Sequence, residues 1–164
     1  MKQNILKFNF KFKNNDFFVT EKNIFAYNLV KVWPKWNNQL VYIYGPEKCG
    51  KTLISNIWIE RSKAKYLSYK TFNKIIKDDL DIELIKRFNW VLDGVDKLIE
   101  EETTDFKKLL NFINVLKTNK DSYLLMTGQK PPKHIECDLD DLTSRLLTSI
   151  VVEVKDPDKE LLSK

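Results

Sequence analysis

The sequence predicts a single α/β domain with a parallel five-stranded sheet flanked by helices. Short apolar runs typical of buried strands recur along the chain, and segments with helical three- and four-residue spacing separate them. Strands that alternate with helices imply parallel pairing, because each crossover helix returns the chain to the same end of the sheet. At 164 residues the chain is long enough for one domain with a real core.

The predicted elements follow one another with short connections. Thr20 is the expected cap of the first helix and Pro34 its expected end. The expected strands are residues 40–44, 66–68, 90–93, 122–127 and 150–154. The expected helices are residues 20–33, 52–62, 71–77, 104–116 and 139–147, and Asp156-Pro157 would begin another.

Composition excludes several classes of protein. The net charge of +5 comes mostly from lysine, and it fits either a lysine-rich genomic composition or a nucleic-acid-binding surface. Cys49, Cys137 and a single histidine, His134, form neither a disulfide framework nor a zinc site. No apolar run approaches the roughly 20 residues of a membrane span, and no signal core begins the chain. We therefore expect a cytoplasmic protein with no membrane partner.

The most specific motif is GPEKCGKT, which matches the phosphate-loop spacing GxxxxGK[ST]. Its glycines let backbone N–H groups turn inward around phosphates, and the following helix presents its positive N-terminus to them. Lys51 would contact the outer phosphates of ATP or ADP, and Thr52 would ligate Mg²⁺. The predicted nucleotide-binding residues of the loop are Gly45, Pro46, Glu47, Lys48, Cys49, Gly50, Lys51 and Thr52.

Two further polar residues follow predicted strands. Asp93 ends an apolar run and is the candidate for a second acid on the magnesium side, with a simple turn residue as the alternative. Thr127 closes the strand at 122–127 and fits a terminal-phosphate sensor and a turn residue equally well. The next carboxylate, Asp96, is interpreted as a solvated turn residue, and Cys49 and His134 are assigned no chemistry.

Arg145 lies in the segment Leu-Thr-Ser-Arg-Leu, near the end of a predicted helix. Spacing alone favours a surface ion pair for this side chain. An arginine at a helix end can also project into the nucleotide site of a neighbouring subunit and stabilise charge there.

Taken together, several segments resemble the AAA+ replication-initiator clan, DnaA and its regulator Hda, and most of all the alphaproteobacterial Hda type. The resemblance spans nearly the whole chain. The segments are Asp16-Phe17-Phe18-Val19, Trp33-Pro34, the phosphate loop, Thr127-Gly128-Gln129-Lys130-Pro131-Pro132 and Leu142-Thr143-Ser144-Arg145-Leu146.

The resemblance implies a nucleotide-bound regulator of replication initiation. Together with the DNA-loaded sliding clamp, such a regulator stimulates ATP hydrolysis by a DnaA-type initiator, and Arg145 matches its arginine finger. Phe18 and Val19 would lie around the adenine, although a core-packing role suits Phe18 equally.

The resemblance also implies a clamp-binding peptide near the N-terminus, in which Gln3, Leu6 and Phe8 match and Asn4 departs from the pattern. Alternate apolar residues over positions 6–13 fit an extended docking peptide or an edge strand of the domain. The expected organisation is therefore an N-terminal segment over residues 1–15 and a nucleotide-binding domain over residues 16–164.

Two departures from the family change the expected activity. Gly94 replaces the second acid that orients the attacking water, and the sequence reaches Lys164 where a helical lid would begin. We therefore expect a domain without a complete lid, and slow or absent intrinsic hydrolysis. With no helix-turn-helix segment, direct DNA binding is not expected. The alternative function is a stand-alone AAA+ ATPase or a P-loop kinase.

Overall fold

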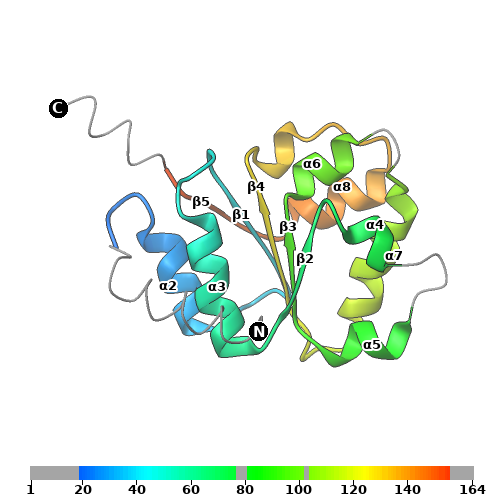
Figure 1. The fold of residues 1–164 in the computed structure, drawn as a ribbon, viewed down its shortest axis with the longest axis horizontal. Coiled ribbons are helices and arrows are strands. Elements are labelled where there is room, and N and C mark those ends of the chain that lie inside the picture. The colour runs from blue at the N-terminus through cyan, green and yellow to red at the C-terminus, as the bar shows by residue number, and fades with distance from the viewer. Residues whose placement is uncertain (1–18, 77–80, 102–103, 156–164) are drawn as a thin grey trace.

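The computed structural model describes residues 19–76, 81–101 and 104–155, which form three layers with one sheet between two groups of helices (Figure 1). The strands are β1 (Leu40–Tyr44), β2 (Lys65–Ser68), β3 (Trp90–Asp93), β4 (Leu124–Gly128) and β5 (Ile150–Glu153). The longer helices are α2 (Ile24–Val32), α3 (Lys51–Ser62), α7 (Phe106–Lys117) and α8 (Asp140–Leu147). The shorter ones are α4 (Phe72–Ile75), α5 (Ile82–Arg87), α6 (Val95–Glu100) and the 3₁₀ helix η1 (Pro132–His134).

All four strand pairings in the sheet are parallel, in the order β2-β3-β4-β1-β5. The chain leaves β1, crosses to the far edge at β2, and returns through β3 to insert β4 beside β1. The register pairs Asp93 with Thr127 and Ile43 with Thr127. Since parallel strands end at the same edge, the ends of β1, β3 and β4 meet there.

Alternation along the strands divides the core into two halves. In β1, Leu40 and Tyr42 belong to the core under α4 to α8, whereas Val41 and Ile43 pack toward α2 and α3. Figure 1 shows the same division, with α2 and α3 on one face of the sheet and the remaining helices on the other. Because both faces are covered, the strands read as continuous apolar runs.

The predicted five-stranded parallel sheet is confirmed. The first helix, however, starts later than predicted. Asn23 occupies the N-cap position, and the Asn23 side chain accepts a hydrogen bond from the backbone N–H of Thr20. Thr20 therefore lies in the turn before the helix and does not cap it.

Helices α5 and α6 were not predicted, because at six residues each they are too short for a periodic apolar pattern. Asp81 caps α5 by accepting a hydrogen bond from the N–H of Leu84. Gly94 begins α6 in a left-handed backbone conformation. Both helices therefore depend on local capping and on packing against the core.

Several predicted features lie outside the described residues: the segment at 6–13, the clamp-contacting Gln3, Leu6 and Phe8, the adenine-side Phe18, and the helix start at Asp156-Pro157. Within the described residues, none of the helices is both long enough and apolar enough to cross a membrane.

The packing of the core predicts that two phenylalanines contribute very differently to the stability of the fold. Phe112 is fully buried in α7 and packs edge-to-face against Phe72 and Trp90, whereas Phe25 in α2 is 73% exposed. We expect Phe112→Ala to lower the free energy of unfolding by about 3–5 kcal/mol, because it removes buried contacts and leaves a cavity. Phe25→Ala, measured in the same urea titration, should change it by less than about 0.5 kcal/mol. Equal effects would contradict this core assignment.

Candidate nucleotide-binding site

The phosphate loop connects the end of β1 to the start of α3. Gly50 adopts a left-handed conformation with φ of 102°, and Lys48 has a positive φ of 62°. Gly45 passes so close to the end of β5 that an added Cβ would lie 2.2 Å from the Val154 carbonyl oxygen. Glycine at positions 45 and 50 is therefore required by the path of the loop.

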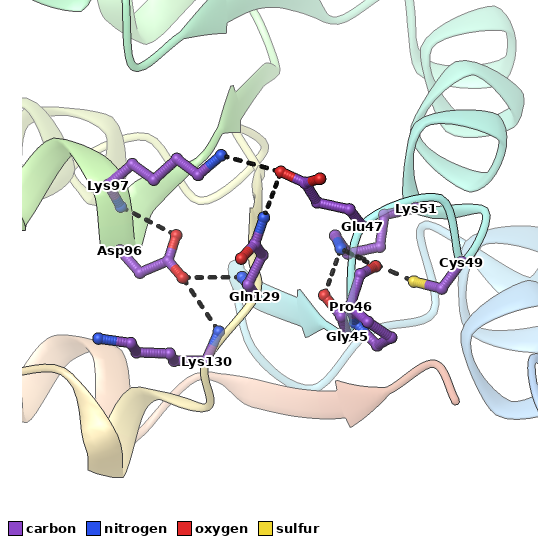
Figure 2. A network of polar contacts seen from close by, with 9 residues as sticks. All are labelled: Gly45, Pro46, Glu47, Cys49, Lys51, Asp96, Lys97, Gln129 and Lys130. Carbon is purple, nitrogen blue, oxygen red and sulfur yellow. Dashed lines mark hydrogen bonds and ion pairs between the residues drawn. The ribbon is translucent and has the colours of Figure 1, made fainter. Parts of the chain in front are cut away.

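Lys51 lies inside this loop. Its Nζ donates hydrogen bonds to the carbonyl oxygens of Gly45 and, at 2.8 Å, Pro46, and it lies 3.7 Å from the Cys49 sulfur. Cys49 is buried and packs with Val154 in the core under α2 and α3. The lysine ammonium is thus held against the loop by two backbone carbonyl oxygens and the Cys49 sulfur (Figure 2).

Asp93 and Thr127 come together at the ends of β3 and β4. The Thr127 hydroxyl donates to Asp93 Oδ1 at 2.5 Å, and the Tyr66 hydroxyl donates to Asp93 Oδ2 at 2.6 Å. Burial, together with the hydrogen bond to Asp93, raises the pKa of Tyr66 above its ordinary value, so the phenol remains a donor. Both oxygens of Asp93 are therefore oriented by hydroxyl groups.

The residue after Asp93 is held in a conformation that favours glycine. Gly94 has a φ of +82°, and its N–H donates to the Thr127 carbonyl and hydroxyl oxygens at 3.1 and 3.2 Å. An added Cβ would lie 2.5 Å from Tyr69 Cδ1. A side chain at position 94 would therefore need both a strained backbone and a displaced Tyr69.

Asp96 is a buried anchor, and its interpretation as a solvated turn residue is wrong. The side chain is only 2% exposed. Its Oδ2 accepts hydrogen bonds from the backbone N–H groups of Gln129 and Lys130 at 2.8 and 3.0 Å, and its Oδ1 accepts one from the Lys97 N–H at 2.9 Å. The carboxylate therefore ties the start of α6 to the loop after β4 (Figure 2).

Tyr42, in β1, contacts the same loop. Its hydroxyl donates to the Lys130 carbonyl oxygen at 2.8 Å. Burial raises the pKa of Tyr42 well above its ordinary value, and the charges of Asp96 and Glu100 add to the effect. Position 128 must be glycine, because an added Cβ would lie 2.1 Å from this hydroxyl.

These parts surround a cavity of about 390 Å³. Its residues fit a phosphate chain with Mg²⁺, since the Lys51 ammonium, the Thr52 hydroxyl and the Asp93 carboxylate come from residues that line one space. The lining residues are Glu47, Lys48, Gly50, Lys51, Thr52, Leu53, Tyr69, Asp93, Gly94, Asp96, Lys97, Thr127, Gly128 and Gln129.

The cavity is also lined by residues to which sequence reasoning assigned no role in the site: Leu53, Tyr69, Gly94, Asp96, Lys97, Gly128 and Gln129. Gln129 and Lys97 both contact Glu47: Gln129 Nε2 donates to Glu47 Oε1 at 3.0 Å, and Lys97 Nζ lies 3.6 Å from the same oxygen. Lys97 Nζ also lies 5.4 Å from the centre of the Tyr69 ring. The sequence offered one signal for these two residues: Gln129 follows Thr127 by two positions, and Lys97 follows Asp93 by four.

Five of the predicted site residues that the structure describes do not line the cavity: Gly45, Pro46, Cys49, Val19 and Arg145. The first three shape the phosphate loop, and the other two lie elsewhere. Arg145 is partly buried on α8, and its Nε donates to Asn114 Oδ1 on α7 at 3.0 Å. Burial, followed by the Arg145 charge, lowers the pKa of Lys117 below its ordinary value. Val19, which precedes α2, is 42% exposed.

The phosphate loop after β1, the acid after β3 and the insertion of β4 between them define an α/β fold of the AAA+ P-loop class. Comparisons with solved structures show the same fold, and replication initiators are among the structures that superpose on this chain.

A crystal structure of a DNA replication initiation factor superposes with a TM-score of 0.75 at 22% identity, covering 91% of this chain and 51% of that one. AMPPCP-bound DnaA from Aquifex aeolicus gives 0.73 at 23% identity, with coverage of 85% and 49%. Domain III of DnaA from Thermotoga maritima gives 0.69 at 22%, with coverage of 89% and 68%.

The chain spans about half the length of the first two of these structures. No protein-family model matches the sequence, and no curated protein matches it. At these identities the likeness concerns the fold, which resembles the AAA+ domain of replication initiators.

The buried position of Asp96 predicts a strong effect of its removal. Asp96→Ala leaves the N–H groups of Gln129 and Lys130 without their acceptor, and we expect the free energy of unfolding to fall by about 2–4 kcal/mol. Asp138→Ala, at an exposed position, should change it by less than about 0.5 kcal/mol in the same denaturation series. A loss for Asp96→Ala as small as that for Asp138→Ala would show that the carboxylate does not anchor the loop.

Proposed function

We propose that this domain binds ATP or ADP with Mg²⁺ in the cavity at the ends of β1, β3 and β4. The observation that carries the proposal is the convergence of Lys51, Thr52, Asp93 and Thr127 on one space. Lys51 would hold the outer phosphates, Thr52 and Asp93 the magnesium side, and Thr127 would face the terminal phosphate. The DnaA structure from Aquifex aeolicus, which is similar in fold, is AMPPCP-bound, and this supports nucleotide binding.

The proposed role is that of an Hda-like regulator of replication initiation, which stimulates ATP hydrolysis by a DnaA-type initiator. Its support is the likeness of the fold to replication initiators and the separation of Arg145 from the chain's own cavity. A finger that acts in trans must lie outside its own nucleotide site and present a charge at the surface.

The position of Arg145 outside the cavity and its surroundings on α8 support this role. The Asn114 side chain accepts a hydrogen bond from Nε, and the positive charge of Arg145 adds to the effect of burial in lowering the pKa of Lys117. In the proposed complex, the terminal guanidinium nitrogens of Arg145 would stabilise charge on the initiator's ATP during hydrolysis.

The sliding clamp is the proposed second partner, and it would dock on Gln3, Leu6 and Phe8 near the N-terminus. Such a peptide binds as an extended segment with alternate side chains in pockets of its partner. The adenine-side role of Phe18 and Val19 belongs to the same proposal.

Nucleotide binding is tested first with the isolated protein. We expect Lys51→Ala to weaken ADP binding by about 10- to 100-fold in isothermal titration calorimetry with Mg²⁺, because one charged hydrogen-bond donor to phosphate is lost. Lys107→Ala removes the same charge at an exposed position on α7 and should leave the affinity unchanged. If both variants bind ADP as tightly as the original protein, the loop is not the phosphate site.

The regulatory role is tested through the initiator. Its ATP hydrolysis is measured with DNA-loaded clamp and with the original protein, Arg145→Ala or Arg87→Ala. We expect the original protein and Arg87→Ala, an exposed control on α5, to stimulate hydrolysis equally. Arg145→Ala should lose nearly all stimulation, because a complete finger contributes about a thousandfold.

Two further results of this assay are informative. No stimulation by a protein that binds nucleotide would reject the regulator and leave a nucleotide-binding module. Stimulation that survives Arg145→Ala would reject the finger alone.

A stand-alone AAA+ ATPase or P-loop kinase is the alternative, and Asp93 and Thr127 in the cavity are what favour it. It predicts nucleotide turnover by the isolated chain that Lys51→Ala abolishes. Gly94 opposes it, since the position where the second acid would stand is held in a left-handed conformation against Tyr69.

A further inference from the structure

The phosphate loop contains an acid, Glu47, whose carboxylate lies across the cavity from its own backbone. The side chain is 70% exposed, and it joins the loop to the opposite wall through Gln129 and Lys97 (Figure 2). Bound phosphates are negatively charged, so an acid in this position is electrostatically opposed to the ligand that the rest of the loop favours.

The two partners of Glu47 mark the end of the cavity that the carboxylate occupies. Gln129 follows Thr127 by two residues, and Lys97 is the third residue of α6, just beyond Asp93. Asp93 and Thr127 are the residues that would face the terminal phosphate and its metal ion. The carboxylate therefore contacts donors at the end where a third phosphate would lie.

Gln129 and Lys97 are also suited to bind a phosphate. An amide N–H₂ and an ammonium donate hydrogen bonds to phosphate oxygens as they do to a carboxylate. The Asp96 carboxylate fixes the backbone of both residues, so their side chains start from anchored positions. An anion that reaches this end must displace Glu47 from these donors or remain beside its negative charge.

The inner phosphates are placed differently. They would be held by the backbone N–H groups of the loop, the N-terminus of α3 and Lys51, none of which depends on the Glu47 side chain. The electrostatic repulsion from Glu47 is consequently strongest at the third phosphate.

We propose that Glu47 sets the discrimination between nucleoside triphosphate and diphosphate, because its carboxylate competes with the terminal phosphate for Gln129 and Lys97. This inference rests on the proposed nucleotide binding in the same cavity. When a triphosphate binds, Gln129 and Lys97 transfer from Glu47 to the terminal phosphate.

The contacts of Glu47 are suited to mutation without loss of the fold. The Lys97–Glu47 ion pair spans 3.6 Å between side chains that are 41% and 70% exposed, and pairs of this kind contribute little to stability. Glu47→Gln keeps an oxygen acceptor for Gln129 and removes only the charge.

The experiment measures the affinities of Mg²⁺-ADP and Mg²⁺-AMPPCP by calorimetry for the original protein, Glu47→Gln and Glu83→Gln. Glu83→Gln is the charge-matched control, at an exposed position on α5. We expect Glu47→Gln to raise the affinity for AMPPCP relative to ADP by about three- to tenfold at low salt, as removal of one nearby like charge predicts. The gain should shrink at high salt, and Glu83→Gln should leave the ratio unchanged.

Lys97→Gln supplies a second, opposite change. Because Lys97 would pair with the terminal phosphate, its loss should lower the affinity for AMPPCP relative to ADP. A ratio that stays within twofold of the original in Glu47→Gln, or moves equally in Glu83→Gln, overturns the inference while nucleotide binding stands. Failure of the original protein to bind either nucleotide rejects the proposed nucleotide binding itself.

Discussion

The parallel register of β1, β4 and β3 is the constraint on which the site depends. It pairs Thr127 with Asp93 on one side and with Ile43 on the other, and the Gly45 N–H donates to the Gly128 carbonyl oxygen at 3.1 Å. A slip of one residue would turn every side chain of a strand to the opposite face of the sheet. Every residue of β4, and every residue of β1 except Tyr44, is buried, so such a slip would disrupt close packing on both faces of the sheet. The same packing that stabilises the domain therefore places the polar groups.

A second constraint holds the loop that follows β4. The buried Asp96 carboxylate accepts hydrogen bonds from two backbone N–H groups of this loop, and the Tyr42 hydroxyl donates one to a carbonyl oxygen of the same loop. The absence of a side chain at Gly128 leaves room for the Tyr42 hydroxyl, which would collide with an added Cβ. The helix that begins after Asp93 and the loop that begins after Thr127 consequently act as one wall, to which Gln129 and Lys97 are fixed.

The features of the fold that the sequence predicts correctly are those determined by nearby residues, because each buried strand is a local apolar run. The phosphate loop is marked by a fixed spacing and Asp93 by its place at the end of a strand, and their roles stay predictions. Asp96 was misjudged because its burial depends on partners 33 and 34 residues away. A carboxylate two residues after a glycine has the local pattern of a turn, and only the insertion of β4 beside β3 covers it.

The start of the first helix was misjudged for a related reason. Thr20 and Asn23 are both residues that cap helices, and the sequence pattern does not distinguish them. In the structure the backbone N–H of Lys155, next to the end of β5, donates to the Lys22 carbonyl oxygen at 3.1 Å. This contact ties the turn before α2 to the sheet, and the helix begins beyond it.

Gly94 connects the backbone geometry with the chemistry that the site favours. Its left-handed conformation starts α6 directly after Asp93, which is what brings Asp96 and Lys97 back toward the cavity within three residues. An acid at position 94 would strain this turn by about 1–2 kcal/mol and would collide with Tyr69. The turn that supplies the anchor and the cation therefore disfavours a water-orienting carboxylate at the same place, and this geometry supports the proposal of a nucleotide that is bound and not rapidly cleaved.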